Sequence, residues 1–182
     1  MWRLIGITLP EHDNVQAERE RIISLLDSGY ITYFHVRKPG FSYERMRQWL
    51  SLFGEEYRKR MSLHDHHELA KMMNVGGIHL NGRNKFPPLD TDGLRLSCSC
   101  HSIPRIEEAK KGMDYLFLSP VFDSISKKGY RAGFTKEELM EASRKGIIDG
   151  KVVALSGVSE DRFEELKAVG FTSAALLGSL WN

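Results

Sequence analysis

Short apolar runs and amphipathic segments alternate along the whole chain. Runs rich in β-branched and aromatic residues predict eight strands, at residues 2–9, 30–38, 61–65, 77–81, 94–101, 115–122, 151–158 and 172–181. Between them, apolar residues recur at the i, i+3, i+4, i+7 spacing of a helix, as in Tyr43, Met46, Leu50 and Phe53. The pattern therefore predicts repeated strand–helix units.

The strands are apolar at most positions instead of alternating with polar residues, which is typical of parallel strands covered on both faces. About eight strand–helix units in 182 residues favour an α/β fold of the (β/α)8 TIM barrel type. An open doubly wound sheet is less favoured, because no G-x-G-x-x-G turn follows the first strand. Two prolines and no helical period in 83–93 predict a shortened fourth helix. The last strand-like run ends at Trp181, where an eighth helix should begin, so we expect this helix to be missing or truncated, with either an open barrel or an incomplete chain.

Residues typical of helix ends mark several boundaries. Thr135 and Glu138 have the spacing of a capping box. Gly29 and Gly170 stand where the glycine after a helix usually lies. These signals place helices between the predicted strands.

Composition narrows the class of protein. The hydrophobic share of 41% suits one domain over residues 1–182, and a formal net charge of +2 without a basic arm argues against nucleic acid or a membrane surface as partner. No run approaches the roughly 18 apolar residues of a membrane helix, and the N-terminal segment lacks the features of a signal peptide, so a cytoplasmic location is expected. Cys98 and Cys100 are expected to be packed, reduced thiols.

Polar residues collect at the carboxyl ends of the predicted strands, where the loops of a (β/α)8 barrel build its site. In chain order they are His35 and Arg37, His64 and Asp65, His79 and Asn81, Ser99 and His101, Ser124, Ser126 and Lys127, Ser156 and Gly157, and Gly178 and Ser179. Fixed cations, hydroxyl donors and glycines that let backbone amides approach a ligand predict a phosphate or diphosphate site. Asp65, a single hard carboxylate at a strand end, is either a Mg²⁺ ligand or the N-cap of the next helix.

Five segments, in chain order, resemble motifs of the thiamine phosphate synthase family, which includes the TenI-type thiazole tautomerases. FHVRK is similar to Q-L-R-E-K or H-I-R-E, and LHDHHELAKMMNVGGIHLNG to N-D-x-x-x-x-A followed by A-D-G-V-H-L-G-Q. SCSCHS resembles G-x-S-x-H-S, DYLFLSPVFDSISKKG resembles A-D-Y-V-x-x-G-P-V-F-x-T-x-x-K, and VVALSGVS resembles P-V-V-A-I-G-G-I. The resemblance covers nearly the whole chain.

The resemblance implies a barrel that joins a hydroxymethylpyrimidine diphosphate to a thiazole phosphate and releases pyrophosphate. Matching positions imply that the diphosphate is held by Arg37, Ser99 and Lys127. They imply that the thiazole phosphate is bound by Ser124, Ser126, Gly157 and Gly178. They place Mg²⁺ at Asp65 and Asn84. The expected partners are these two small molecules and a second copy of the chain in a homodimer.

Several positions depart from the family pattern. Pro39 stands where synthases carry a lysine, and Lys38 is its candidate replacement in phosphate binding. Asn84 stands where the second acidic metal ligand is expected, and His64 replaces the asparagine before Asp65, so a weakened metal site is expected.

Histidines leave other functions open. His35 leans toward the tautomerase branch, as a substrate hydrogen-bond partner or a general base, whereas Pro120 is the residue of the synthases. His64, His79 and His101 are candidates for substrate binding, and the last two equally for packed, hydrogen-bonded residues. A tautomerase with His35 or His101 as base would need no metal. A non-catalytic relative that binds a thiamine precursor is a third reading, and a zinc hydrolase built on the HDHH segment a remote fourth.

Overall fold

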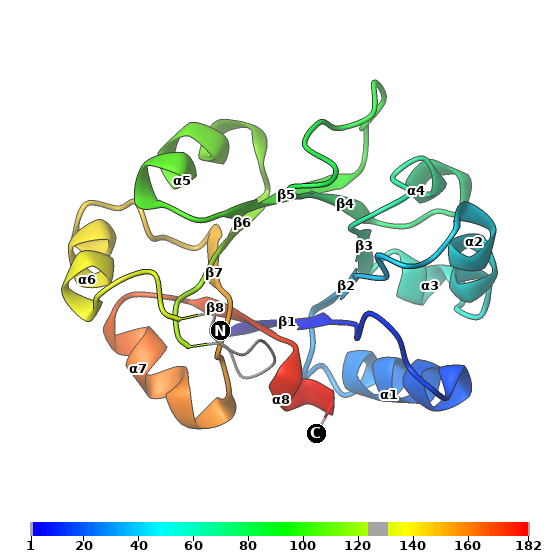
Figure 1. Cartoon of the computed structure of the whole chain (residues 1–182), viewed down its shortest axis with the longest axis horizontal. Coiled ribbons are helices and arrows are strands. Elements are labelled where there is room, and N and C mark those ends of the chain that lie inside the picture. Colours follow the sequence, from blue (N-terminus) through cyan, green and yellow to red (C-terminus); the bar gives the residue numbers. More distant parts are fainter. Residues whose placement is uncertain (1, 124–130, 182) are drawn as a thin grey trace. The chain divides into compact units, whose positions relative to one another are not determined.

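The computed structural model describes residues 2–123 and 131–181. Its strands follow one another in the order β1 to β8 and close into a barrel, and the pairs from β2 to β4 and from β5 to β8 are parallel (Figure 1). The strands are β1 Arg3–Ile7, β2 Tyr33–Val36, β3 Met61–Leu63, β4 Gly77–Leu80, β5 Arg95–Cys100, β6 Tyr115–Leu118, β7 Val152–Ala154 and β8 Ser173–Leu176. The predicted (β/α)8 barrel is confirmed, in its closed form.

Helices follow most strands. They are α1 Val15–Asp27, α2 Tyr43–Ser51, α3 Glu55–Arg58, α4 Leu69–Met72, α5 Ile103–Ala109, α6 Lys136–Arg144, α7 Phe163–Ala168 and α8 Gly178–Trp181, with 3-10 turns at Lys110–Gly112 and Glu160–Arg162. Residues 81–94, all described, contain no helix, as the prolines predicted (Figure 1). The last strand was predicted too long, since it ends at Leu176 and a one-turn helix follows. Within the described residues, no helix is long and apolar enough to cross a membrane.

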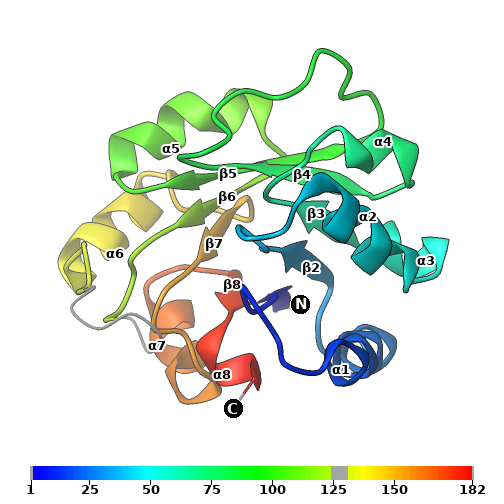
Figure 2. The same cartoon turned by 45° about the vertical axis from the view of Figure 1, so that its right-hand side comes forward.

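The chain divides into two compact units. The first unit is Gly6–Leu96, and the second joins Met1–Ile5 to Ser97–Asn182. In the first unit, Phe34 pairs with Met61 and Ser62 with Gly77, which sets the register of β2, β3 and β4. Helices α1 to α4 lie along one side of these strands (Figure 2). The buried residues of α1, α2 and α4 contribute to the core of this unit, in which Phe34 and Met61 are fully buried.

Local signals begin and end these helices. Asn14 Oδ1 accepts a hydrogen bond from the backbone N–H of Ala17 at the start of α1, and Ser42 caps α2 in the same way. Gly29 follows α1 with a φ of 74°, a left-handed conformation that favours glycine. The amphipathic pattern and the caps therefore act together.

In the second unit, β5 pairs with β6 from Ser97 opposite Tyr115 onward, and β7 and β8 continue the ladder. The predicted capping box is confirmed, because Thr135 and Glu138 exchange both hydrogen bonds at the start of α6. Cys98 and Cys100 are free and buried, as expected. This unit carries the segments after β5 to β8.

Candidate functional site

Two cations and one carboxylate meet after strands β2, β3 and β4 of the first unit. Arg83 Nε lies 3.0 Å from Asp65 Oδ1 and Arg83 Nη2 lies 2.9 Å from Asp65 Oδ2, so the guanidinium donates a hydrogen bond to each carboxylate oxygen. Asn84 Nδ2 also donates to Asp65 Oδ1, at 3.0 Å. We call Arg37, Asp65, Arg83 and Asn84 the arginine cluster.

The turn after β4 holds Arg83 in this position. Asn81 Oδ1 accepts hydrogen bonds from the backbone N–H groups of Arg83 (2.9 Å) and Asn84 (3.2 Å). Asn81 Nδ2 donates to the carbonyl of His64 at 2.8 Å, and Asn84 Nδ2 donates to the same carbonyl at 2.9 Å. The side chains of the turn thus fasten it to the end of β3, a tight arrangement that asparagine readily supports.

Arg37 follows β2 directly and is half-buried. Its backbone N–H donates to Thr8 Oγ1 at 2.9 Å, and this bond holds the backbone of Arg37 in place. Burial lowers the pKa of Arg37 and the charge of Arg83 lowers it further, while Asp65 acts in the opposite direction. The two guanidinium groups are therefore close enough to repel each other, and an anion near both would be attracted.

A cavity of about 560 Å³ adjoins the cluster. Besides Asp65, Arg83 and Asn84 of the cluster, its wall is formed by Pro39, Phe41, His66, His67, Glu68, Phe86, Pro87 and Pro88. This volume is within the usual range for a small-molecule site. The cavity combines a charged side with an aromatic and proline side.

The predicted metal ligands do not fit a divalent cation. Both oxygens of Asp65 are engaged by Arg83, and Asn84 presents its amide nitrogen, because Nδ2 donates to two acceptors. An amide N–H is no ligand for Mg²⁺, which takes oxygen. The N-cap reading is not supported either, because Glu68 stands at the N-cap of α4. Among residues 2–123 and 131–181, Asp65 belongs to no group of three metal-ligating side chains.

Three histidines pack together inside the first unit. His35 Nδ1 and His64 Nε2 are 2.9 Å apart and share a hydrogen bond, and the rings of His64 and His79 stack with centroids 4.2 Å apart. Burial lowers the pKa of all three, to about 3 for His79. Because His35 is fully buried, the structure gives it no access to solvent as a general base.

The HDHH segment does not gather its histidines around one point. His64 turns to His35, whereas His66 Nε2 donates to the carbonyl of Phe41 at 2.8 Å. The three-histidine group that the described residues do contain is His35 on β2, His79 on β4 and His64, which follows β3. The histidines of the HDHH segment therefore do not form the zinc site that the hydrolase hypothesis requires.

The buried histidines predict a loss of stability in acid. The unfolded chain protonates its histidines below a pKa of roughly 6.5, but folded His79 stays neutral until about pH 3, so the free energy of unfolding falls as the pH drops below roughly 6.5. The lowered pKa of His79 alone should reduce the free energy of unfolding by about 2 kcal/mol at pH 5 relative to neutral pH. Urea unfolding followed by tryptophan fluorescence at neutral pH and near pH 5 measures this. His79→Gln should reduce the difference, and equal stability at both pH values would refute the prediction.

Lys38 is not where its predicted role requires it. Its side chain is 1% exposed and its Nζ lies 2.6 Å from Glu18 Oε1, on α1. Trp49 Nε1, on α2, donates to the other oxygen of Glu18 at 3.1 Å. Burial lowers the pKa of Lys38 and the bond to Glu18 opposes this. The ammonium group of Lys38 is therefore buried in an ion pair with Glu18 of α1 and is not available to a phosphate. The expectation that Lys38 replaces the lysine lost at Pro39 is wrong.

The second unit holds the other predicted residues. Ser99 lies on β5 and is half-buried, and exposed His101 donates from Nδ1 to the carbonyl of Ser119 at 2.9 Å. Gly178 begins α8. The predictions for Ser124, Ser126 and Lys127 lie outside the described residues.

The loop after β7 adopts an unusual backbone. Ser156 and Gly157 have φ values of 84° and 65°, and a Cβ at Gly157 would collide with the carbonyl of Asp123. Ser156 Oγ donates to the carbonyl of Phe122 at 3.2 Å, which ties this loop to the segment after β6. Gly157 is thus required by the close approach of two loops. Its predicted phosphate contact stays a prediction.

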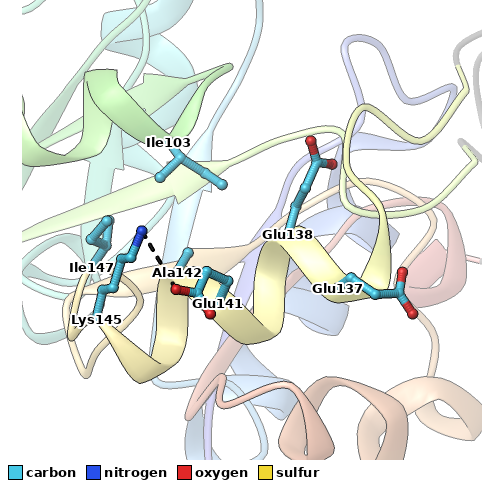
Figure 3. Close-up of a pocket in the computed structure, with 7 residues that line it drawn as sticks. All are labelled: Ile103, Glu137, Glu138, Glu141, Ala142, Lys145 and Ile147. Carbon is cyan, nitrogen blue, oxygen red and sulfur yellow. Dashed lines mark ion pairs between the residues drawn. The ribbon is translucent and has the colours of Figure 1, made fainter.

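A second cavity, of about 350 Å³, lies beside α6 (Figure 3). Ile103, Ala142 and Ile147 give it an apolar floor, and Glu141 pairs with Lys145 at its edge. None of the predicted site residues lines it. The arginine cluster, not this cavity, carries the candidate chemistry.

Arg83 and Thr8 are the residues of this site that the sequence analysis missed. Arg83 lies in a stretch without periodicity, and Thr8 lies inside a predicted strand. The signal for Arg83 was present, since a cation adjoins the position where a metal-binding acid was expected.

Comparisons with known proteins agree with the fold and with the resemblance. A family model described as "Thiamine monophosphate synthase" matches residues 4–180. The crystal structure of thiamine phosphate pyrophosphorylase from Bacteroides thetaiotaomicron is 39% identical, covers 99% of this chain and 85% of its own, and has a TM-score of 0.83. The thiamine-phosphate synthase of Caldicellulosiruptor bescii is 25% identical over 177 residues, which is 93% of this chain and 80% of that protein. The pyrophosphorylase from Pyrococcus furiosus shares the fold, with 22% identity, a TM-score of 0.68 and coverage of 97% and 85%.

Proposed function

Because the chain belongs to the thiamine monophosphate synthase family, we propose that it joins a hydroxymethylpyrimidine diphosphate to a thiazole phosphate and makes thiamine phosphate. The observation that carries the proposal is the family match over residues 4–180. The arginine cluster supports it, because one substrate and one product bear a diphosphate. Two guanidinium groups and one carboxylate leave a net positive charge there.

The reaction suits fixed cations. The bond between the pyrimidine methylene carbon and the diphosphate oxygen breaks, and its electron pair leaves with pyrophosphate. The lone pair of the thiazole nitrogen forms the new carbon–nitrogen bond, which gives the thiazolium ring. Negative charge on the leaving oxygen grows along this path, so Arg37 and Arg83 would stabilise the transition state more than the bound substrate. Neither arginine needs to lose a proton.

The other predicted contacts remain part of the proposal. Ser99 and Lys127 would hold the diphosphate, and Ser124, Ser126, Gly157 and Gly178 would bind the thiazole phosphate. The left-handed backbone at Gly157 supports this role, since it is a conformation in which main-chain groups can face an anion. The family resemblance implies Mg²⁺ in this reaction, but the groups present at Asp65 and Asn84 do not fit this ion, because Arg83 engages both oxygens of Asp65 and Asn84 presents N–H groups.

The tautomerase reading has less support. It needs an accessible base, and His35 is buried and hydrogen-bonded to His64. His101 is exposed and its Nε2 faces away from the bond to Ser119, so it is the better candidate base on that reading. The synthase is therefore the function that we propose.

The proposed activity is tested by mixing the protein with both substrates and measuring thiamine phosphate by mass spectrometry. We expect product only when both substrates are present. His101→Gln should retain activity if the protein is a synthase. A folded protein that forms no thiamine phosphate, but isomerises a thiazole carboxylate phosphate, would replace the proposal with the tautomerase.

A further inference from the structure

The Asp65–Arg83 pair stands where the family resemblance places a metal ion. Arg83 engages Asp65 through two N–H groups, at 3.0 and 2.9 Å, and the 81–84 turn holds the backbone of Arg83 in place. Asp65 has a side chain that is only 14% exposed, whereas that of Arg83 is 47% exposed. The inner edge of the guanidinium is thus anchored while its outer edge faces solvent.

The remaining donors of this guanidinium are available to a ligand. Of the five N–H groups of an arginine, Asp65 takes two. The other three have no partner among the described residues, and the side chain lines the 560 Å³ cavity. A planar fork of N–H groups matches two oxygens of a phosphate. An anchored arginine also loses little side-chain freedom when the phosphate binds.

The charges of the arginine cluster support the same conclusion. Two acids with Arg37 would carry a net negative charge, and a diphosphate would then need a divalent cation to bind there. In this chain Asn84 stands at the position expected for the second acid, and the adjacent residue is Arg83. The arginine cluster therefore has a net positive charge without any metal. Asn84 thus leaves the site without its second acidic ligand, and Arg83 supplies a cation beside it.

We propose that the Arg83 guanidinium, anchored by Asp65, takes the place of a divalent metal ion and binds the diphosphate, so that this chain binds pyrophosphate without Mg²⁺. The inference rests on the proposed function for the identity of its ligand. It adds Arg83 as a diphosphate-binding residue and gives Asp65 the role of holding it.

Pyrophosphate binding and metal binding test the proposal without turnover. Pyrophosphate is titrated calorimetrically into the protein in a chelator, and Mn²⁺ alone is titrated by electron paramagnetic resonance. We expect pyrophosphate to bind in the chelator, and Arg83→Gln to weaken it by about 10- to 100-fold, the loss of charge-assisted hydrogen bonds. Arg47→Gln, which removes an exposed arginine paired with Glu44, is the matched control and should change it less than about twofold.

The metal arm uses a variant that restores the missing acid. Wild-type protein should show no saturable Mn²⁺ binding in the millimolar range, whereas Arg83→Ser with Asn84→Asp should acquire it and should then bind pyrophosphate only with Mg²⁺. Pyrophosphate binding by wild type that disappears in the chelator, or an Arg83→Gln variant that binds normally, would overturn the inference. Absence of thiamine phosphate with intact metal-free pyrophosphate binding would instead count against the proposed function alone.

Discussion

Replacing Arg37 by alanine is expected to lower kcat/KM for thiamine phosphate formation by roughly two to three orders of magnitude, the usual cost of removing one preorganised group that stabilises developing charge. Arg37 is half-buried beside Arg83 and Asp65, so its charge acts in a medium that screens it less than water does. Its backbone is held by Thr8, independently of the side chain. The fold should therefore survive the change.

Steady-state kinetics with matched variants measure this loss. Arg47→Ala removes an exposed arginine of α2 from the same unit and should leave kcat/KM unchanged. Arg37→Lys should recover only part of the activity, because a lysine keeps the charge but not the fork of donors. If Arg37→Ala and Arg47→Ala have equal activity, Arg37 does not contact the reacting groups.

Replacing Glu18 by glutamine is expected to destabilise the protein by about 3–5 kcal/mol, because it leaves the Lys38 charge buried without its partner. Lys38 and Glu18 are each 1% exposed and 2.6 Å apart. Glutamine keeps the size of the side chain and an acceptor for Trp49 Nε1, so the variant isolates the loss of charge. Urea unfolding at neutral pH measures the change.

Two further variants separate the buried charge from other causes. Glu44→Gln breaks an exposed pair with Arg47 and should lower the free energy of unfolding far less than Glu18→Gln does, because solvent screens the exposed charges. Adding Lys38→Met to Glu18→Gln should restore much of the lost stability, because no unpaired charge then remains in the interior. A Glu18→Gln variant as stable as Glu44→Gln would contradict the importance of the pair.

Much of the fold followed from the spacing of apolar residues. All eight strands were predicted, because a strand covered on both faces needs an apolar run. Their carboxyl ends were placed too far along the chain. The run at 115–122 continues past β6, but Pro120 has no N–H for the ladder, and β6 ends at Leu118. The apolar residues that follow the end of a strand are buried under the loop, and the spacing of apolar residues does not distinguish them from residues of the strand.

Barrel closure could not be read from the last apolar run alone. The backbone N–H of Arg3 donates to the carbonyl of Thr172 at 3.1 Å, which joins the first strand to the start of the last. This bond links positions at opposite ends of the chain. It does not depend on the length of the final helix.

The candidate site was predicted in part. Arg37 and Asp65 were placed correctly at the ends of neighbouring strands, because strand order alone brings them to one edge. Lys38 was placed wrongly, because its partner Glu18 lies on a preceding helix where a carboxylate usually faces water. Arg83 was missed because a turn, not a periodic element, positions it. Side-chain pairing between elements is the information that the sequence did not supply.

The most direct test of the proposed function is the stoichiometry of the two products. Protein, hydroxymethylpyrimidine diphosphate and thiazole phosphate are incubated together, and thiamine phosphate and pyrophosphate are quantified in the same samples over time. We expect equal amounts of both products and none of either when the thiazole phosphate is omitted. Pyrophosphate released without thiamine phosphate, or no release by folded protein that binds pyrophosphate, would contradict the assignment of this chain as a thiamine phosphate synthase.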